Sequence, residues 1–444
     1  MKALNEAPFL ELMQAQVAPG DRVLAAVSGG ADSMAMLDLL LRFKSKLDYD
    51  VEVVHVHHHL RAASDEEWRF LERYCAERGV PFHGCHVQVR AACAKGESLE
   101  ACAHRLRHAA FRDVAAASGT QWLALAHQAD DRAETVLMNI LRGCALSGLA
   151  AMPARDGWLL RPLLAYRKAE LEAYCQTQRI PYVCDESNAD TTILRNRLRH
   201  ELLPELAAYN PQITSALGRL AENSESVLDH LRQEAQALYD NACVLGAAHW
   251  CLLDRTVLSA AHVAVRDTLV HQLAQRFSSG RSSLRRDMVT ACGERLHAGT
   301  GRVDLGQGLL LETSRRWCYI GQQPQGTWHR ENDRWCQDFL DAEVCAPAHI
   351  TVRTWQSGDA IALKNLGHKS PKKIFQETAL PSCLRAVWPV IYDTKIKEII
   401  CLPFLASERK LMYYNSVTYL KDALSVRIAQ QTVRPALTQN NKDK

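Results

Sequence analysis

The chain has 444 residues, enough for two or three domains that each bury a core of their own. Hydrophobic residues make up 47% and charged residues 23%, and no stretch reaches the roughly 18 consecutive apolar residues of a membrane span. The formal net charge of +3 comes from 53 basic and 50 acidic side chains, so global charge neither requires nor excludes a nucleic-acid partner.

The 15 cysteines are scattered, and no pair has the Cys-x-x-Cys spacing of zinc ribbons or thioredoxin-like redox sites. We interpret them as small buried hydrophobic residues in a reducing compartment. The N-terminus carries Glu6 and Glu11 and lacks the apolar core of a signal peptide. The sequence therefore predicts a cytoplasmic protein without a membrane partner.

The first part of the chain alternates short apolar runs with segments of helical period. The runs predict strands at residues 22–27, 51–56, 83–89 and 122–126. The periodic segments predict helices at residues 33–43, 65–78, 97–117 and 131–142. This alternation predicts an α/β fold, in which a doubly wound parallel sheet has helices on both faces.

The pattern changes after Pro211. Residues 212–244 and most of 257–298 have helical period, which predicts a small helical domain. A polar segment at 322–332 is interpreted as a linker, and a strand-rich α+β unit follows it. Its predicted strands include residues 350–355, 388–392 and 398–402, and the tail from 430 is predicted to be disordered. The predicted domains are 1–210, 211–321 and 333–428.

The strongest motif is Ser28-Gly29-Gly30-Ala31-Asp32-Ser33, which follows an apolar strand and opens a helix at Ser33. Glycines let backbone N–H groups approach phosphate oxygens, and a helix N-terminus adds a positive dipole. An aspartate fits an anion site when a cation such as Mg²⁺ lies between it and the phosphates. A plain strand–helix turn with Asp or Ser as N-cap is the alternative. The Walker pattern is absent.

This motif resembles the PP-loop of ATP pyrophosphatases, and further stretches resemble the tRNA(Ile)-lysidine synthetases. One is His55-Val56-His57-His58-His59-Leu60-Arg61, similar to the family's His-Val-x-His-x-Leu segment. Another is the stretch from Ala126 to Thr135, similar to Ala-His-x-x-Asp-Asp-x-x-Glu-Thr. Shorter matches follow in order: Arg161-Pro162-Leu163, Asp185-Glu186-Ser187-Asn188, Arg195 to Arg199, Leu202-Leu203-Pro204, Gly358-Asp359, Lys372 to Glu377, Arg385 and Trp388-Pro389.

His127 and Asp131 follow the strand predicted at 122–126, so both lie at the carboxyl edge of the sheet, where parallel sheets bind their ligands. Asp131 is expected to open the next helix and to share a metal ion with Asp32. Helix capping is the alternative for Asp130 and Asp131, and a satisfied buried histidine is the alternative for His127.

Histidines occur at two places that need comment: a run of three after the second predicted strand, and a position where the family has an arginine. His57, His58 and His59 suggest a metal site, but adjacent strand residues point to opposite faces, so we favour a strand-end loop over a zinc site. The family shows Ala-Arg-x-x-Arg-Tyr on the helix before the strand at 122–126, whereas this chain has His104 for the first arginine and retains Arg107 for the second. Arg105 lies about 100° round the helix and is an imperfect substitute.

The resemblance implies that L-lysine is ligated, with ATP, to C2 of the wobble cytidine in tRNA(Ile) with a CAU anticodon. It implies that Ser28, Gly29, Gly30, Ala31 and Ser33 bind the phosphates and that Asp32 and Asp131 hold Mg²⁺. His127, Arg107 and Arg195 are the further catalytic candidates, with Arg199 neutralising phosphate charge beside Arg195. Candidate RNA phosphate contacts are Lys364, Lys369, Lys372, Lys373 and Arg385, for which a solvated surface is the alternative.

Other readings stay open. One alternative is a tRNA thiolase, which paired Cys-x-x-Cys motifs would indicate. Another is a glutamine-fed amide synthetase, which an N-terminal catalytic cysteine would indicate. The sequence shows neither feature. A nucleotide-binding sensor without chemistry is the reading from another functional class. Asp131, Arg195 and the C-terminal extension argue against the sensor.

Overall fold

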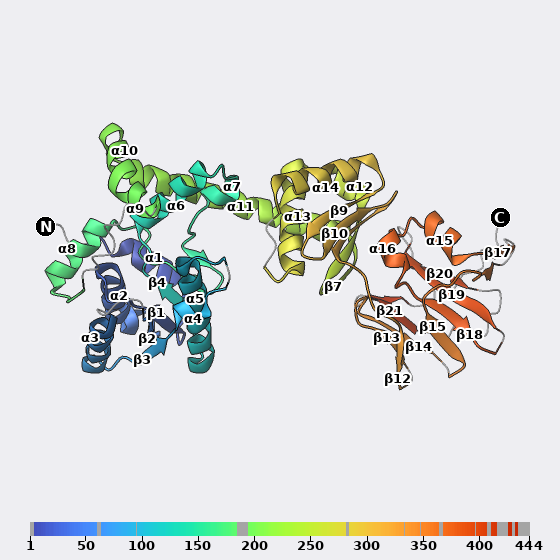
Figure 1. Ribbon diagram of the computed structural model, residues 1–444, viewed down its shortest axis with the longest axis horizontal. Coiled ribbons are helices and arrows are strands. Elements are labelled where there is room, and N and C mark those ends of the chain that lie inside the picture. The colour runs from blue at the N-terminus through green and yellow to red at the C-terminus, as the bar shows by residue number, and fades with distance from the viewer. Residues whose placement is uncertain are drawn as a thin grey trace. The chain divides into compact units, whose positions relative to one another are not determined.

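The computed structural model describes residues 4–59, 64–94, 96–183, 194–280, 284–332, 334–346, 348–363, 367–395, 397–405, 410–414, 425–428 and 431–433. The chain divides into two compact units, Met1–Leu228 and Asp229–Lys444 (Figure 1). The predicted motif at 185–188 and Lys364 lie outside the described residues. The division into three domains therefore stays a prediction.

A six-stranded sheet forms the centre of the first unit. Its strands are β1 (Arg22–Ala26), β2 (Asp50–His57), β3 (Phe82–His86), β4 (Trp122–Leu125), β5 (Arg155–Asp156) and β6 (Leu159–Leu160). They lie in the order β3-β2-β1-β4-β6-β5, and every pairing is parallel except that of the edge strand β5. Because β1 pairs with both β2 and β4, the crevice at its carboxyl end is the switch point of the sheet. The predicted doubly wound parallel fold is confirmed.

Helices cover both faces of this sheet. One face packs against α1 (Ala7–Gln16), α2 (Ala31–Leu47), α3 (Ser64–Glu77) and α8 (Lys168–Gln178), and the other against α5 (Leu99–Ser118). Alternation along β1 explains the two cores, since Val23 and Ala25 belong to the first and Leu24 to the second. The short helix α4 (Val89–Ala92) precedes α5.

A separate helical cluster of the first unit positions the residues that approach the sheet edge. It contains α6 (Ala129–Leu141), α7 (Leu146–Leu149), α9 (Leu194–Arg197), a π-helical turn (Leu198–Leu202), α10 (Leu203–Tyr209) and the beginning of α11 (Ile213–Ala242). Its core includes Ala133, Val136 and Leu137 of α6, packed with Leu198, Leu203 and Leu217. This packing holds α9, which carries Arg195, and the π-helical turn, which carries Arg199, against α6.

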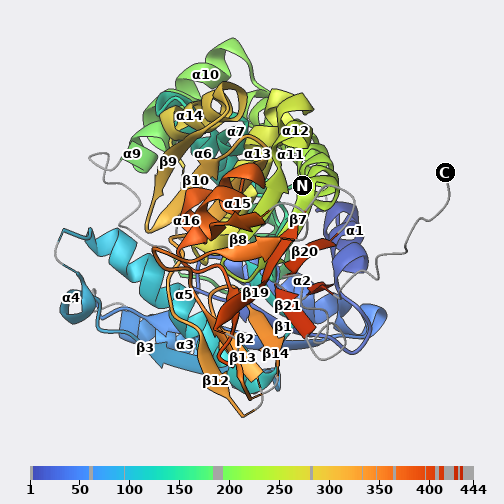
Figure 2. The same cartoon turned by 90° about the vertical axis from the view of Figure 1, so that its right-hand side faces the viewer.

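The predicted small helical domain is helical only in part. Its helices α12 (Arg255–Ala260), α13 (Val263–Phe277) and α14 (Arg286–Ala298) pack against an antiparallel sheet (Figures 1 and 2). The strands are β7 (Cys243–Ala247), β8 (Trp250–Asp254), β9 (Gly301–Gly306), β10 (Leu309–Thr313) and β11 (Trp317–Gln322), in the order β7-β8-β11-β10-β9. Strands β10 and β11 are buried on both faces, so they lack the alternation by which half-buried strands are recognised.

The predicted strand-rich C-terminal unit is confirmed, with a β-strand even inside the predicted linker. One sheet contains β12 (His329–Glu331), β13 (Arg334–Gln337), β14 (Ala342–Cys345), β21 (Ser425–Ile428) and β22 (Gln431–Val433). A second contains β15 (Ile350–Arg353), β18 (Val390–Asp393), β19 (Glu398–Leu405) and β20 (Lys410–Tyr414), and β16 (Ile361–Leu363) pairs with β17 (Gly367–Lys369). Helices α15 (Pro371–Glu377) and α16 (Ser382–Arg385) complete it.

The middle sheet and the C-terminal strands share one hydrophobic core. Trp250, Trp317 and Tyr319 of the middle sheet belong to the same buried cluster as Trp388 and Ile391. The Nε1 atom of Trp250 also donates a 2.7 Å hydrogen bond to the carbonyl of Phe339. Residues 322–332 therefore do not separate two independent cores. Within the described part of the chain, no helix has the length and apolar character needed to cross a bilayer.

Candidate active site

The predicted phosphate-binding motif forms the turn between β1 and α2. Gly29 has φ +92°, a conformation that favours glycine, and Gly30 is the N-cap of α2. The helix begins at Ala31, two residues before the predicted start at Ser33, because Gly30 in extended conformation already ends the turn. The backbone of Gly29 accepts a 2.9 Å hydrogen bond from the N–H of Val183, which ties the loop to the segment after α8.

Ser33 organises the loop from inside the first helical turn. Its Oγ atom accepts hydrogen bonds from the backbone N–H groups of Ser28 and Gly29, both at 3.2 Å. It donates to the carbonyl of Gly30 at 2.9 Å and lies 3.3 Å from the hydroxyl of Ser28. Ser33 is buried, so this hydroxyl fixes the loop conformation in the absence of a ligand.

Asp32 is a half-buried carboxylate, one oxygen of which has no hydrogen-bond donor within the described part of the chain. Its Oδ1 atom is buried and has no hydrogen-bond partner among the described residues. Burial, followed by the negative charge of Asp131, raises the pKa of Asp32 to about 6, against the lowering effect of Lys168. A cation placed beside this oxygen would relieve the cost of burying its charge.

Asp131 caps α6 and is already paired. The helix begins at Ala129, two residues before the predicted start at Asp131, because Gln128 provides the N-cap and its side chain accepts from the N–H of Asp130 at 2.6 Å. Asp131 Oδ2 completes the capping box by accepting from the backbone N–H of Gln128 at 3.1 Å. The capping alternative is thus confirmed for Asp131, and its other oxygen, Oδ1, faces two arginines.

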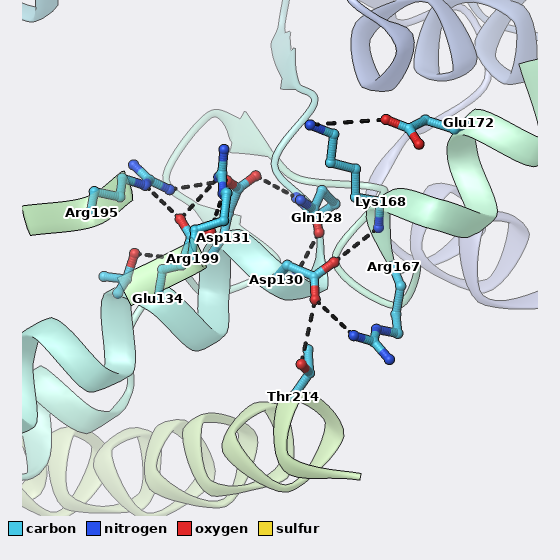
Figure 3. A network of polar contacts seen from close by, with 11 residues as sticks. Gln128, Asp130, Asp131, Glu134, Arg167, Lys168, Glu172, Arg195, Arg199 and Thr214 are labelled. Atoms are coloured by element: carbon cyan, nitrogen blue, oxygen red, sulfur yellow. Dashed lines mark hydrogen bonds and ion pairs between the residues drawn. The ribbon is translucent and has the colours of Figure 1, made fainter. Parts of the chain in front are cut away.

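Those two arginines join α6 to α9, which carries Arg195, and to the π-helical turn, which carries Arg199 (Figure 3). Arg195 and Arg199 lie 3.1 and 3.2 Å from Asp131 Oδ1. Their Nε atoms donate to Glu134 at 2.8 and 2.6 Å, and the Glu134 side chain is fully buried. We name Asp131, Glu134, Arg195 and Arg199 the carboxylate–arginine cluster. The sequence analysis included Glu134 in the family segment but gave it no role, although its position three residues after Asp131 on one helix face was a usable signal.

Asp130 points away from this cluster and has a structural role. Its carboxylate accepts from the backbone N–H of Lys168 at 3.0 Å and lies 3.4 Å from both Arg167 and Thr214 (Figure 3). Asp130 therefore connects the start of α6 to α8 and α11. Lys168, at the start of α8, was also missed by the sequence analysis, and its ammonium lies 3.9 Å from Glu172.

His127 lies just after β4 and is neutral at physiological pH. Burial and the charges of Arg161, Arg195 and Arg107 lower its pKa to about 3. Its Nδ1 atom is buried and has no hydrogen-bond partner among the described residues. The ring therefore offers an unused polar atom and no positive charge. The alternative of a satisfied buried histidine is wrong, because this nitrogen is unsatisfied.

The basic residues of α5 face different directions and therefore have different surroundings. Arg107 is partly buried, its Nε atom has no described partner, and burial together with Arg195 lowers its pKa. Arg105 instead makes a bidentate pair with Glu97 at 2.9 and 2.7 Å on the exposed side. His104 is exposed and its ring is tilted at 38° to that of His108, with ring centroids 4.3 Å apart. Arg105 is therefore committed to Glu97 and does not replace the family arginine.

Two cavities meet at the β1–α2 loop, and Arg107 lines both. The strand-end cavity, of 390 Å³, has apolar walls from β1, β2 and β4, with His55, His58, Glu67, Phe111 and His127 also lining it. The helix-end cavity, of 660 Å³, is lined by polar groups at the starts of α2, α6 and α8 and by the arginine-bearing turn. Its charged residues are Asp32, Arg107, Asp131, Lys168, Glu172, Arg195 and Arg199.

The cavities bring together most of the predicted site residues. Ser28, Gly30 and Ser33 line both, while Ala31, Asp32, Asp131 and Arg195 line the helix-end cavity. His127 lines the strand-end cavity alone, and His104 lines neither. A slot with apolar walls that opens at a glycine turn into a charged cavity has the two surfaces that a nucleotide requires, one for a flat base and one for phosphates.

Comparison with known proteins matches two parts of the chain to family models. Residues 3–206 match the family model of the PP-loop domain, and residues 350–410 match the model described as "TilS substrate C-terminal domain". The chain is 35% identical over 423 residues to the tRNA(Ile)-lysidine synthase of Geobacter sulfurreducens, covering 84% of this chain and 87% of that one. It is 32% identical to the enzyme of the same name from Pseudomonas putida, covering 83% and 89%.

A solved structure, the U34-tRNA thiolase NcsA from Methanococcus maripaludis, is 16% identical with a TM-score of 0.42 and covers 51% of this chain and 78% of that one. That likeness is too low to bear on function. The two synthases, by contrast, are matched along most of their own length as well as most of this chain. The chain belongs to the tRNA(Ile)-lysidine synthase family.

Proposed function

We propose that the protein ligates L-lysine to C2 of the wobble cytidine in tRNA(Ile) with a CAU anticodon, using ATP and releasing AMP and pyrophosphate. The observation that carries this proposal is the similarity to lysidine synthases along more than four fifths of the chain, C-terminal unit included. The paired cavities at the β1–α2 loop support it, since they supply a base slot and a charged phosphate surface at one sheet edge.

In this proposal the adenine occupies the strand-end cavity and the phosphates extend along the loop into the helix-end cavity. The apolar ends of β1, β2 and β4 provide flat contact for the base. Arg107 lines both cavities, and its Nε atom has no partner in the part of the chain that the structure describes, which suits a contact with the α-phosphate between them. Ser28, Gly29, Gly30, Ala31 and Ser33 hold the following phosphates through the loop and the start of α2.

Asp32 and Asp131 are proposed to hold Mg²⁺. The unpartnered Oδ1 of Asp32 fits such an ion, because carboxylate oxygen is the ligand that Mg²⁺ prefers. When bound, the ion neutralises charge on the phosphates. Asp131 Oδ1 pairs with Arg195 and Arg199, which fix the orientation of this carboxylate where it lines the helix-end cavity.

The chemistry proposed is two substitutions. The C2 carbonyl oxygen of the cytidine attacks the α-phosphorus, and the bond to the pyrophosphate oxygen breaks. The lysine amine then attacks C2, AMP leaves with the former carbonyl oxygen, and the amine loses a proton. Arg107, Arg195 and Lys168 supply positive charge where negative charge gathers on phosphate. Neutral His127 offers a hydrogen bond without adding charge beside the adenylated base.

The exposed basic residues of α15 are proposed to contact RNA phosphates. Lys372 and Lys373 are exposed near the start of this helix. Lys369 is paired with Glu377 at 2.9 Å, and Arg385 donates from Nε to the carbonyl of Leu380, so these two are already engaged within the fold. Lys372 and Lys373 are therefore the stronger candidates of the predicted set. A cytoplasmic location, where tRNA is found, belongs to the same proposal.

Mass spectrometry of the wobble nucleoside tests the proposal. The purified chain is incubated with bulk tRNA, ATP and L-lysine, and the expected product is a cytidine that has gained one lysine and lost one water. Repeated rounds of pyrophosphate release that add no lysine to the wobble cytidine would point to another PP-loop tRNA modification, such as thiolation. No pyrophosphate release under any condition would favour a nucleotide-binding sensor, and either outcome contradicts lysidine formation.

A further inference from the structure

Three histidines meet at the carboxyl edge of the sheet, outside both cavities. His57 ends β2, His59 follows two residues later, and His86 ends the neighbouring strand β3. The parallel register pairs His57 directly with His86. One ring nitrogen from each of the three lies within 4.8 Å of the others, and His86 Nδ1 is 3.0 Å from His59 Nε2. From the sequence we favoured a strand-end loop over a zinc site, because adjacent strand residues point to opposite faces. In the structure that argument excludes only His58 from a metal site.

We propose that His57, His59 and His86 bind a divalent transition-metal ion of the zinc class. Imidazole nitrogen is a preferred ligand of Zn²⁺, and three histidines with one further position form a known tetrahedral set. Bonds of about 2.1 Å in a tetrahedral site place ligand nitrogens about 3.4 Å apart. The observed group therefore requires only small side-chain rotations. Asp65 Oδ1 lies 3.1 Å from His57 Nε2 and is placed to orient that ring or to provide the fourth ligand.

The surroundings of the three rings form a supported site and not a chance surface contact. His57 is 2% exposed, and its Nε2 atom lies 3.1 Å from Asp65 Oδ1, while His59 and His86 are exposed. Trp68 of α3 stacks on His86, with ring centroids 4.4 Å apart at 18°. Trp68 can lie there because residue 84 is glycine, where an added Cβ would come within 1.9 Å of its ring. The indole thus fixes the orientation of His86.

The backbone at His59 supports the same inference. Its φ of +52° is uncommon for a residue other than glycine, and strained conformations of this kind gather at ligand sites. The strain places the ring beside His57, at a centroid distance of 4.1 Å. The proposed reaction does not use these three rings, so a metal site here goes beyond the proposed function.

An ion at this site would hold the end of β2 to β3 and α3. His58 lies between two of the ligands and lines the strand-end cavity together with His55. The ion would therefore fix one wall of that cavity without entering it. Its chemical role is structural, because the three ligands lie outside both cavities.

Calorimetric titration of the full chain with ZnCl₂ tests the proposal, after treatment with chelator and without ATP or tRNA. Four proteins are compared: wild type, His86→Ala, His59→Gly and the control His83→Ala. His59→Gly removes a ligand while glycine accepts the positive φ, so this variant is expected to fold. His83 lies on the same strand but contacts Glu52 at 2.7 Å, so its loss tests the effect of removing any histidine.

We expect wild type and His83→Ala to bind the same number of zinc equivalents, with one equivalent lost or weakened at least about tenfold in His86→Ala and His59→Gly. Zinc should raise the unfolding temperature of wild type more than that of His59→Gly. Equal binding in all four proteins would overturn the proposal, as would no saturable binding by wild type. The readout involves neither ATP nor tRNA, so it is independent of the proposed enzymatic function.

Discussion

Asp32 and Asp131 come from the first turns of two different helices and line one cavity, yet their environments are opposite. Asp131 Oδ1 is held by two arginines, whereas Asp32 Oδ1 is buried with no partner among the described residues. The ionised Asp131 therefore contributes, after burial, to raising the pKa of Asp32 to about 6. One carboxylate is fixed as an anion, and the other is left available to a cation.

The first prediction concerns Asp32→Asn. The pKa of Asp32 in the folded chain lies above its ordinary value of 3.8, so ionisation costs folded-state stability. This cost is absent below the unfolded-state pKa and complete above the folded-state pKa. Asp32→Asn should therefore be more stable than wild type by about 3 kcal/mol at pH 7, with the gain disappearing as the pH falls toward 4. Urea unfolding without Mg²⁺ at several pH values measures this.

The same variant should lose ATP-dependent pyrophosphate release, because the amide cannot replace the carboxylate as a cation ligand. Asp48→Asn, at the exposed C-cap of the same helix, is the matched control and should retain activity. A folded Asp32→Asn protein with near-normal turnover would show that the helix-end cavity does not bind the phosphates.

The second prediction separates three neighbouring positions on α5. Arg107→Ala should lower kcat/KM by an amount corresponding to at least about 2 kcal/mol, because a charge-assisted contact with phosphate is lost. Arg105→Ala should change kcat/KM and stability little, since Arg105 forms a surface pair with Glu97. His104→Arg should leave the pH profile unchanged, because His104 lines neither cavity.

Steady-state kinetics for ATP between about pH 6 and pH 9 measure all three variants, across the range where an unperturbed histidine loses its charge. If His104→Arg raised activity only at alkaline pH, histidine would be supplying a charge that the structure assigns to Arg107. A silent Arg107→Ala would contradict the assignment of this helix face to the nucleotide.

Local sequence signals were sufficient for the parallel sheet and the β1–α2 loop. The apolar strand before Gly29 and the periodic segment after Ser33 determine that turn by themselves. The start of α6 was misplaced by two residues, because Gln128 is a less common N-cap than the aspartates that follow it. The β-sheet of the middle segment was missed for a different physical reason. Fully buried strands such as Leu309–Thr313 have no alternating pattern of apolar and polar residues.

Contacts between distant residues could not be predicted in the same way. Asp131 pairs with Arg195 and Arg199 because a helical segment more than 60 residues later along the chain packs against α6. The histidine group depends on the register of β2 with β3, which pairs residues 57 and 86. Sequence spacing supplies neither the register nor the rotation of that segment.

The third prediction treats Glu134 as a positioning residue. Glu134→Gln removes the charge that both arginines share in a buried position, and the expected loss of unfolding free energy is about 3 kcal/mol. Because Arg195 and Arg199 would lose their alignment, KM for ATP should also rise at a temperature where the variant is folded. Glu222→Gln, which changes an exposed partner of Arg132, should affect both quantities much less. A destabilised variant with unchanged KM would limit Glu134 to a structural role.

The last prediction concerns the C-terminal unit. Truncation after about Gln325 would expose Trp250 and Trp317, which share a core with the removed residues, so it cannot test RNA binding alone. Lys372→Glu is the sharper test, because this side chain is exposed on α15. If Lys372 contacts a phosphate, the variant should bind tRNA more weakly, and its affinity should depend less steeply on salt by about one unit of logarithmic slope.

Filter binding of tRNA at several salt concentrations measures this, and the Kd for ATP should stay unchanged. Lys46→Glu, the same charge reversal at an exposed site in the first unit, is the control and should behave like wild type. Equal weakening by both variants would mean that only overall charge matters, because net charge changes identically in the two proteins. Weakening confined to Lys372→Glu requires a local contact, since long-range attraction between exposed charges is screened beyond about 10 Å at 0.1 M salt.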